Sequence, residues 1–170
     1  MIIKNYKDID KEKIKMNVKN LKGYNFKKNQ KQWDKKPSII FTNGCFDLLH
    51  IGHIRCLKKM RELGGVVIVG LNSDESIRKL KGIERPIFPL EERMEILDSL
   101  EYVDIVTSFD DVSSYNIIKH ISPDILVKGK DWENKVIGQD YVESYGGKVI
   151  LFELTQNKST TNIIKKLKNG

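Results

Sequence analysis

The chain has 170 residues, of which 39% are hydrophobic and 31% charged, and its formal net charge is +7. This length suits one ordinary domain with its own core, and the longest apolar run, Val66-Val67-Ile68-Val69, is far too short to cross a bilayer. The start shows no apolar signal-peptide segment, and Cys45 and Cys56 form neither a CxxC motif nor a metal-ligand pattern. We therefore expect a protein of the reducing cytoplasm with no membrane segment.

The positive charge is concentrated in the first 36 residues. This segment holds 12 Lys and 4 Asp or Glu, a net charge of +8, whereas the rest of the chain has a net charge of −1. We expect a basic N-terminal arm over residues 1–36 and one domain over residues 37–170. The spacing of Ile14, Val18 and Leu21 is compatible with a docked helix in the arm. The arm lacks Arg and mixes its lysines with acids and amides, which favours a solvated leader over a nucleic-acid-binding segment.

From residue 38 onward, apolar strand-like runs alternate with helical patterns. The expected strands are 38–43, 66–72, 102–107, 125–128 and 148–152. The expected helices are 51–63, 74–79, 90–100, 113–121, 138–145 and 159–167. This alternation predicts an α/β fold, a Rossmann-like open parallel sheet of five strands with helices on both faces. Such a sheet binds ligands beyond the carboxyl ends of its strands, where the strand order reverses.

The first strand-to-helix turn carries the most specific signal. Residues 42–53 read Thr-Asn-Gly-Cys-Phe-Asp-Leu-Leu-His-Ile-Gly-His, with His50 and His53 on one side of the first helical turn. A helix start has unpaired N–H groups and the positive end of the helix dipole, which suits a phosphate. Gly52 lets a ligand approach the backbone between the two histidines. The chain has no GxGxxG after the first strand and no GxxxxGK[ST], which disfavours dehydrogenases and P-loop enzymes.

The segment Asn43-Gly44-Cys45-Phe46-Asp47, followed by His50-Ile51-Gly52-His53, resembles the signature of nucleotidyltransferases with an HxGH motif. Further stretches resemble one subfamily, the D-glycero-β-D-manno-heptose 1-phosphate adenylyltransferases, which often form the C-terminal half of a protein fused to a heptose 7-phosphate kinase. These stretches are Asn72-Ser73-Asp74, Leu80-Lys81-Gly82, Arg85-Pro86-Ile87, Pro89-Leu90-Glu91, Arg93, Val127-Lys128-Gly129, Asp131 and Ser159-Thr160-Thr161-Asn162-Ile163-Ile164. The resemblance covers residues 37–167 and leaves the arm unmatched.

This resemblance implies an enzyme that joins ATP and heptose 1-phosphate to give ADP-heptose and pyrophosphate. The sugar phosphate would attack the α-phosphorus directly, so catalysis would depend on placement and charge stabilisation. Mg²⁺ is expected with the triphosphate, because such reactions commonly need the phosphate charge neutralised, and no metal-binding residue is assigned, although Asp47 could reach a metal as well as the sugar hydroxyls. The resemblance also implies a homodimer.

The resemblance implies roles for individual residues as well. Those expected to act in catalysis are His50, His53, Lys81 and Arg93. Those expected to bind the nucleotide are Asn43, Gly44, Cys45, Phe46, His50, Gly52, His53, Lys128, Gly129, Asp131, Ser159, Thr160 and Thr161. Those expected to bind the acceptor substrate are Asp47, Asn72, Asp74, Lys81 and Arg85.

Several of these residues also have a purely structural interpretation. Phe46 suits the core as well as a ligand contact, Asp47 suits a turn cap, and Ser159 suits the N-cap of the last helix. The arginines suit bidentate phosphate contact and the lysines act as point charges, and the alternative for all of them is a solvated surface. Cys45 has no paired base near it in the sequence, so packing is favoured over a nucleophilic role.

Two other functions stay open. Glycerol-3-phosphate cytidylyltransferases, or other CTP-using cytidylyltransferases for sugar or polyol phosphates, share the first motif and the final Ser-Thr-Thr, and typically carry Arg-Thr-x-Gly-Ile before it. Leu154-Thr155-Gln156-Asn157-Lys158 stands there instead, whereas Asp131-Trp132 resembles the cytidylyltransferase version, so ATP and CTP both remain open. The remote alternative is a nucleic-acid-binding module that uses the arm. It predicts salt-sensitive binding that deletion of residues 1–36 abolishes, whereas the enzyme predicts largely intact chemistry after that deletion.

Overall fold

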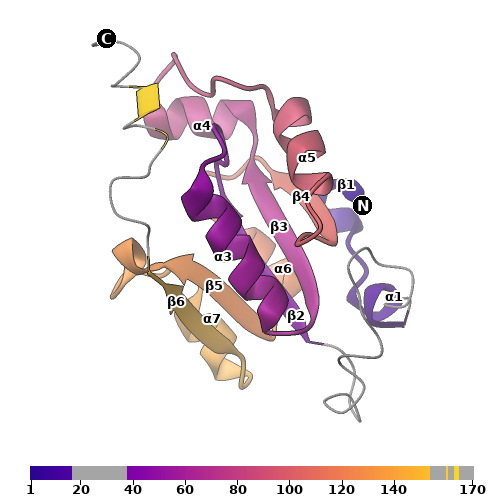
Figure 1. Cartoon of the computed structure of the whole chain (residues 1–170). Coiled ribbons are helices and arrows are strands. Elements are labelled where there is room, and N and C mark those ends of the chain that lie inside the picture. The colour runs from indigo at the N-terminus through magenta and orange to yellow at the C-terminus, as the bar shows by residue number, and fades with distance from the viewer. Residues whose placement is uncertain (17–37, 154–159, 161–162, 165–170) are drawn as a thin grey trace.

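The computed structural model describes residues 1–16, 38–153, 160 and 163–164. Its centre is one sheet of six parallel strands in the order β1-β4-β3-β2-β5-β6. The strands are β1 (Ile2–Asn5), β2 (Ile39–Gly44), β3 (Val66–Asn72), β4 (Ile105–Phe109), β5 (Ile125–Gly129) and β6 (Lys148–Phe152). Because all the strands run in the same direction, their carboxyl ends meet at one edge of the sheet (Figure 1).

Helices cover both faces of this sheet, with α3 in front of it and α6 behind it in Figure 1. The helices are α1 (Lys11–Met16), α3 (Ile51–Glu62), α4 (Asp74–Lys81), α5 (Leu90–Asp98), α6 (Tyr115–Ile121) and α7 (Gln139–Ser144), with short 3₁₀ helices η1 (Tyr6–Asp8) and η3 (Lys130–Trp132). The expected α/β class and open parallel sheet are confirmed, with six strands where five were expected. In the described part of the chain, no helix is long and apolar enough to span a membrane.

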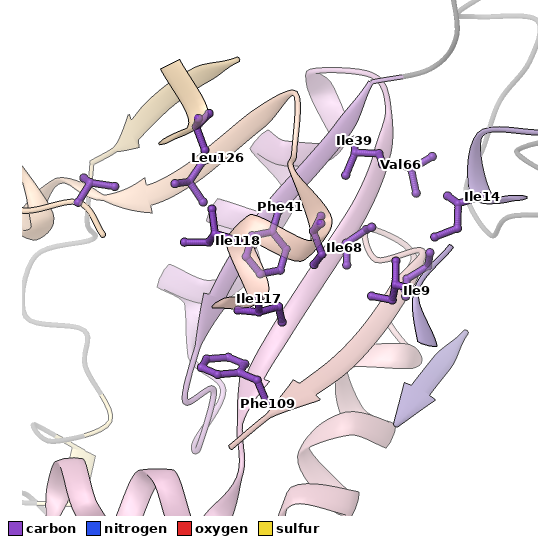
Figure 2. Packing of buried hydrophobic residues seen from close by; sticks show 14 residues of the cluster. Ile9, Ile14, Ile39, Phe41, Val66, Ile68, Phe109, Ile117, Ile118 and Leu126 are labelled. Atoms are coloured by element: carbon purple, nitrogen blue, oxygen red, sulfur yellow. The ribbon is translucent and has the colours of Figure 1, made fainter. Parts of the chain in front are cut away.

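Neighbouring residues of the central strands point into opposite cores. Ile39 and Phe41 belong to the cluster on the α6 side, whereas Ile40 belongs to the cluster on the α3 and α5 side. Figure 2 shows the first cluster, in which Ile117 and Ile118 of α6 meet Phe41. All seven residues of β3 are buried, as expected for an apolar strand between two helical layers.

The sixth strand, β1, comes from residues that the sequence assigned to the basic arm. It pairs with β4 at the edge of the sheet, and the N-terminal ammonium of Met1 donates to the carbonyl of Asp104 at 2.8 Å and to a carboxylate oxygen of Asp98. Ile9 and Ile14 follow, only 5% and 7% exposed, and join the core on the α6 side (Figure 2). Residues 1–16 are therefore part of the folded body. Val18 and Leu21 lie outside the described residues.

This placement changes what a deletion of the arm would do. Removing residues 1–36 would take away an edge strand and two core isoleucines, so intact chemistry is no longer the expected result. A deletion that tests the arm alone has to begin after residue 16.

The strand order reverses beside β2. From β2 the sheet continues through β3 to β4 on one side and through β5 to β6 on the other. The crevice at such a reversal is the place where open α/β sheets bind ligands. β2 ends at Asn43-Gly44 and β5 ends at Lys128-Gly129. The fold therefore brings the histidine-bearing turn and the segment after β5 to one site.

Replacing Ile9 by Ala is expected to lower the free energy of unfolding by about 2–5 kcal/mol, because it opens a cavity in the core. Ile83→Ala is the matched control, since that isoleucine is 84% exposed, and its expected effect is below about 0.5 kcal/mol. Urea unfolding of both variants measures the difference. Equal midpoints for the two would contradict the packing of the N-terminal segment on the domain.

Candidate active site

His50 and His53 lie in the N-terminal turn of α3, and His50 is its N-cap. The Nδ1 of His50 accepts the N–H of Gly52 at 3.2 Å, and the Nδ1 of His53 accepts the N–H of His50 at 3.4 Å. The two rings are stacked with their centroids 3.8 Å apart. Because Nδ1 is an acceptor in both rings, each neutral imidazole carries its proton on Nε2, and Nε2–H is the group that can donate to a phosphate oxygen.

His53 is a neutral donor at physiological pH. Burial lowers its pKa to about 4, and the neighbouring His50 adds to the lowering. The ring of Phe46 lies 4.9 Å from the ring of His53, and Phe46 itself is buried in the core on the α3 side. Phe46 has a φ of 45°, in the left-handed region, which turns the chain sharply between β2 and α3. Of its two expected roles, the structure shows the packing one.

Asp47 holds the loop that precedes α5. Its buried carboxylate accepts the Nε–H of Arg85 at 2.6 Å and the backbone N–H groups of Ile87 and Phe88 at 2.8 and 3.1 Å. Both Asp47 and Arg85 were expected to bind the acceptor substrate. Both carboxylate oxygens of Asp47 are engaged by the protein, so the structure shows Asp47 tethering the loop, and its role in binding the acceptor stays a prediction.

Arg93 ties four segments together from inside the domain. Its Nη1 donates to the carbonyls of Cys45 and Asn72 at 2.7 and 3.0 Å, and its Nε donates to the carbonyl of Phe88 at 3.0 Å. Its Nη2 donates to Asp74 at 2.7 Å, and its side chain has no exposed surface. The donors of Arg93 are thus engaged by protein groups, and its expected part in catalysis stays a prediction. This guanidinium positions the ends of β2 and β3, and it also engages Asp74, which was expected to bind substrate.

A cavity of about 430 Å³ opens at the carboxyl ends of β2, β3 and β5. Six of its lining residues were expected in the site from the sequence, namely Asn43, Gly44, Cys45, Asn72, Lys81 and Lys128. The two histidines are not among the lining residues, although they lie on the same strand-to-helix connection. The same strand-to-helix connection thus carries cavity-lining residues at its start and the two histidines at its end.

Lys128 is the most deeply buried cation of the cavity wall, with 7% of its surface exposed. Its Nζ donates to Oδ1 of Asn43 and lies 5.9 Å from the centre of the Trp132 ring. Burial lowers the pKa of Lys128 to about 8, although the attraction of Asp131 opposes this effect. Asp131 itself is exposed in η3, and Gly129 ends β5 beside it.

Cys45 lines the same cavity but is not activated as a nucleophile. Burial raises the pKa of its thiol, and the nearby cations Lys81, Arg93 and Arg85 only partly oppose this. A protonated thiol is a poor nucleophile, which agrees with the packing role expected from the sequence.

The Ser-Thr-Thr segment reaches the histidine turn through Thr160, whose Oγ1 donates to the carbonyl of Leu48 at 3.2 Å. Ser159 and Thr161 lie outside the described residues. Six further residues line the cavity but were not among the site residues predicted from the sequence. They are Leu80, Val112, Ser113, Ser114, Trp132 and Ile137. Trp132 follows the expected Asp131, and the sequence left open whether it packs over the pocket or in the core; it lines the cavity. Ser113 and Ser114 carry no local signal, because the position of β4 in the sheet brings them here.

Residues 41–166 match the family described as cytidylyltransferase-like. The chain belongs to this family, and it is a nucleotidyltransferase.

Among curated proteins, the chain is similar to the bifunctional protein HldE of Geotalea uraniireducens (strain Rf4), with 50% identity over 133 residues, covering 78% of this chain and 27% of that protein. It is also 49% identical over 137 residues to the bifunctional protein HldE of Helicobacter hepaticus (strain ATCC 51449 / 3B1), covering 80% and 28%. The chain thus spans just over a quarter of the length of these relatives.

Two solved structures share the fold. The lipopolysaccharide core biosynthesis protein from Thermoplasma volcanium GSS1 has a TM-score of 0.57 and 24% identity, covering 72% of this chain and 99% of that one. The pantoate-beta-alanine ligase from Francisella tularensis has a TM-score of 0.56 and 17% identity, covering 99% and 77%. At these identities the likeness concerns the fold alone.

Replacing His53 by Ala is expected to lower kcat by about 100-fold or more, because a transition-state donor is lost. His53→Gln places an amide near the position of Nε2, whereas His53→Asn reaches only as far as Nδ1, so the Gln variant is expected to keep more activity. Steady-state pyrophosphate release measures all three. His120→Ala, at the third histidine of the chain on α6, is the control and is expected to keep normal turnover. A normal rate in folded His53→Ala would remove His53 from the mechanism.

The pKa of Lys128 predicts a pH dependence of kcat/KM, which reports groups of the free enzyme. The ammonium is charged below pH 8 and neutral above it, so kcat/KM for a phosphorylated substrate is expected to fall as the pH rises through about 8. Lys128→Met should lack this decline, whereas Lys79→Met, at an exposed lysine paired with Glu75, should keep it. If kcat/KM of Lys128→Met still falls as the pH rises through about 8, the decline does not come from Lys128.

Proposed function

We propose that the chain transfers the adenylyl group of ATP to D-glycero-β-D-manno-heptose 1-phosphate, giving ADP-heptose and pyrophosphate. The observation that carries this proposal is the pair of Nε2–H donors at the start of α3, on the same connection that lines a cavity with two lysines. A helix start with neutral donors suits a triphosphate, and a cavity bearing cations suits a phosphorylated acceptor.

The proposed step is one in-line displacement. An oxygen of the sugar phosphate forms a bond to the α-phosphorus of ATP, the bond from the α-phosphorus to the oxygen that bridges to the β-phosphorus breaks, and pyrophosphate leaves with the electron pair. The attacking oxygen already carries negative charge, so the step needs no general base. His50 and His53 donate from Nε2 to phosphate oxygens whose charge grows in the transition state, and the lowered pKa of His53 keeps that ring a neutral donor.

The choice of heptose is supported by the relatives and by the motifs. The HldE relatives are named as bifunctional, and this chain aligns with just over a quarter of their length, as expected for the transferase part of a two-activity protein. The sequence Arg85-Pro86 followed by Pro89-Leu90-Glu91 resembles the heptose subfamily and forms the start of α5 and the loop before it, which Asp47 and Arg93 hold. The stretch that resembles the heptose subfamily is therefore held in a defined conformation by Asp47 and Arg93.

A second candidate is a cytidylyltransferase that acts on glycerol 3-phosphate or another polyol or sugar phosphate. The observation that favours it is Asp131-Trp132, which resembles the cytidylyltransferase sequence, with Trp132 on the cavity wall.

Mg²⁺ is proposed to bind together with the nucleotide. No group of three or more His, Cys, Asp or Glu side chains that could hold a metal exists in residues 1–16, 38–153, 160 and 163–164. The carboxylates of Asp47 and Asp74 are engaged by Arg85 and Arg93, so these residues do not fit a metal site built by the protein. Triphosphate oxygens and water would then supply the ligands, and the ion would neutralise phosphate charge.

A homodimer is proposed on the same family resemblance, and a cytoplasmic location is proposed on the two cysteines, which form no CxxC motif. These proposals concern the setting of the enzyme and leave the chemistry at the site unchanged.

The test is pyrophosphate release with ATP, CTP, GTP and UTP, each combined with heptose 1-phosphate and with glycerol 3-phosphate. We expect strong release only with ATP and heptose 1-phosphate. The double variant His50→Ala/His53→Ala supplies the background rate for every pair of substrates. Strong release only with CTP and glycerol 3-phosphate would overturn the proposal in favour of the second candidate.

A further inference from the structure

We infer that Lys128 and Asn43 form the subsite for the phosphate group of the acceptor substrate, a phosphate monoester, in the cavity between the ends of β2 and β5. The inference rests on the proposed function for the chemistry of the acceptor. It differs from the sequence-based expectation, which assigned both residues to the nucleotide.

The first argument is an unbalanced charge. A buried lysine is normally paired with a carboxylate, because removing an ammonium from water is costly. Lys128 is 7% exposed, yet its hydrogen-bond partner is the neutral amide of Asn43. Within the described residues, no carboxylate forms an ion pair with Lys128, although Asp131 acts on it through a longer-range attraction. A bound phosphate would supply the missing negative charge.

The second argument is the direction in which the ammonium is held. Asn43 ends β2 and Lys128 lies near the end of β5, so their hydrogen bond crosses the point where the strand order reverses. An ammonium group has three N–H donors, and Asn43 takes one of them. Both side chains line the cavity, so the remaining donors of Lys128 are available to a ligand within it.

The third argument separates the two substrates. The start of α3 carries the histidines and does not line the cavity, whereas Asn43, Gly44 and Cys45 of the same connection do. We infer that a triphosphate on α3 and an acceptor in the cavity would meet at this connection, where an acceptor oxygen can approach the α-phosphorus. In-line attack requires this proximity.

The remaining walls suit a sugar phosphate. Leu80, Val112, Ile137 and the ring of Trp132 offer apolar surface to the C–H face of a sugar, and Ser113 and Ser114 offer hydroxyl groups. Lys81 is a second cation on the wall, but it is exposed and lies at the end of α4. It therefore makes an informative comparison, because it carries the same charge in the same cavity without burial.

The direct test is titration calorimetry with inorganic phosphate at pH 7, on the protein alone and on the protein saturated with α,β-methylene-ATP, which fills the triphosphate site without reacting. We expect Lys128→Met to weaken phosphate binding by about tenfold or more, as loss of a charge-assisted contact does. Asn43→Asp should weaken it as well, because the new carboxylate neutralises the ammonium with almost no change in shape. Lys81→Met should have a smaller effect, and Lys79→Met should bind phosphate normally.

Thermal melting checks that each variant is folded, and Asn43→Asp carries the test if Lys128→Met does not fold. The inference is overturned if the wild-type protein does not bind phosphate. It is also overturned if Lys128→Met and Asn43→Asp bind phosphate as tightly as the wild-type protein does. It is also overturned if Lys128→Met weakens binding of the methylene analogue while leaving phosphate binding unchanged.

Steady-state kinetics separate this inference from the proposed function. Lys128→Met is expected to raise the KM of the acceptor by about tenfold or more while leaving the KM of the nucleotide within about twofold. If the wild-type enzyme uses CTP and glycerol 3-phosphate, the same split in KM keeps the subsite and removes the proposed function. If the wild-type enzyme uses ATP and heptose 1-phosphate but Lys128→Met leaves the KM of the acceptor unchanged, the proposed function is supported and the proposed subsite is wrong.

Discussion

The geometry of the site depends on one buried guanidinium. Arg93 reaches from α5 to the carbonyls of Cys45 and Asn72, so the ends of β2 and β3 keep a fixed separation. Its other bonds, to Phe88 and Asp74, fix the loop before α5 and the start of α4. A buried charged group costs free energy unless its donors are satisfied, and here they are satisfied only when all of these segments are in place. Folding of the scaffold and formation of the site are therefore one event.

The fold was readable from the sequence wherever a strand is buried on both faces. β3, whose residues are all buried, matches its expected range residue by residue, because an uninterrupted apolar run of this length is typical of a covered strand. β6 also matches its expected range, although it is an edge strand whose residues are partly exposed. β4 begins three residues later than expected, because Asp104 accepts the N–H of Val67 with its side chain in a turn before the strand. β1 was missed because it is a short edge strand with largely exposed residues, and tertiary contacts of the chain terminus hold it in place.

The site was readable to the extent that its chemistry is local. His50, Gly52 and His53 are fixed by their spacing in one helical turn, and the structure places them at the start of α3. Asp47 and Arg93 could not be assigned in this way, because a carboxylate or a guanidinium serves a ligand or a scaffold equally well. Burial decides between the two roles, and burial results from segments that are far apart in the sequence.

Charge balance offers a physical criterion for dividing the cations of this site. Arg85 and Arg93 are paired with Asp47 and Asp74, so their charges are already neutralised inside the protein and add little attraction for a phosphate. In the described part of the chain, neither Lys81 nor Lys128 forms an ion pair, and both line the cavity. A paired cation holds the protein together, whereas an unpaired cation in a cavity retains its attraction for an anionic ligand. Because burial weakens screening by water, that attraction is stronger at the buried Lys128 than at the exposed Lys81, which is why the proposed phosphate subsite is assigned to Lys128.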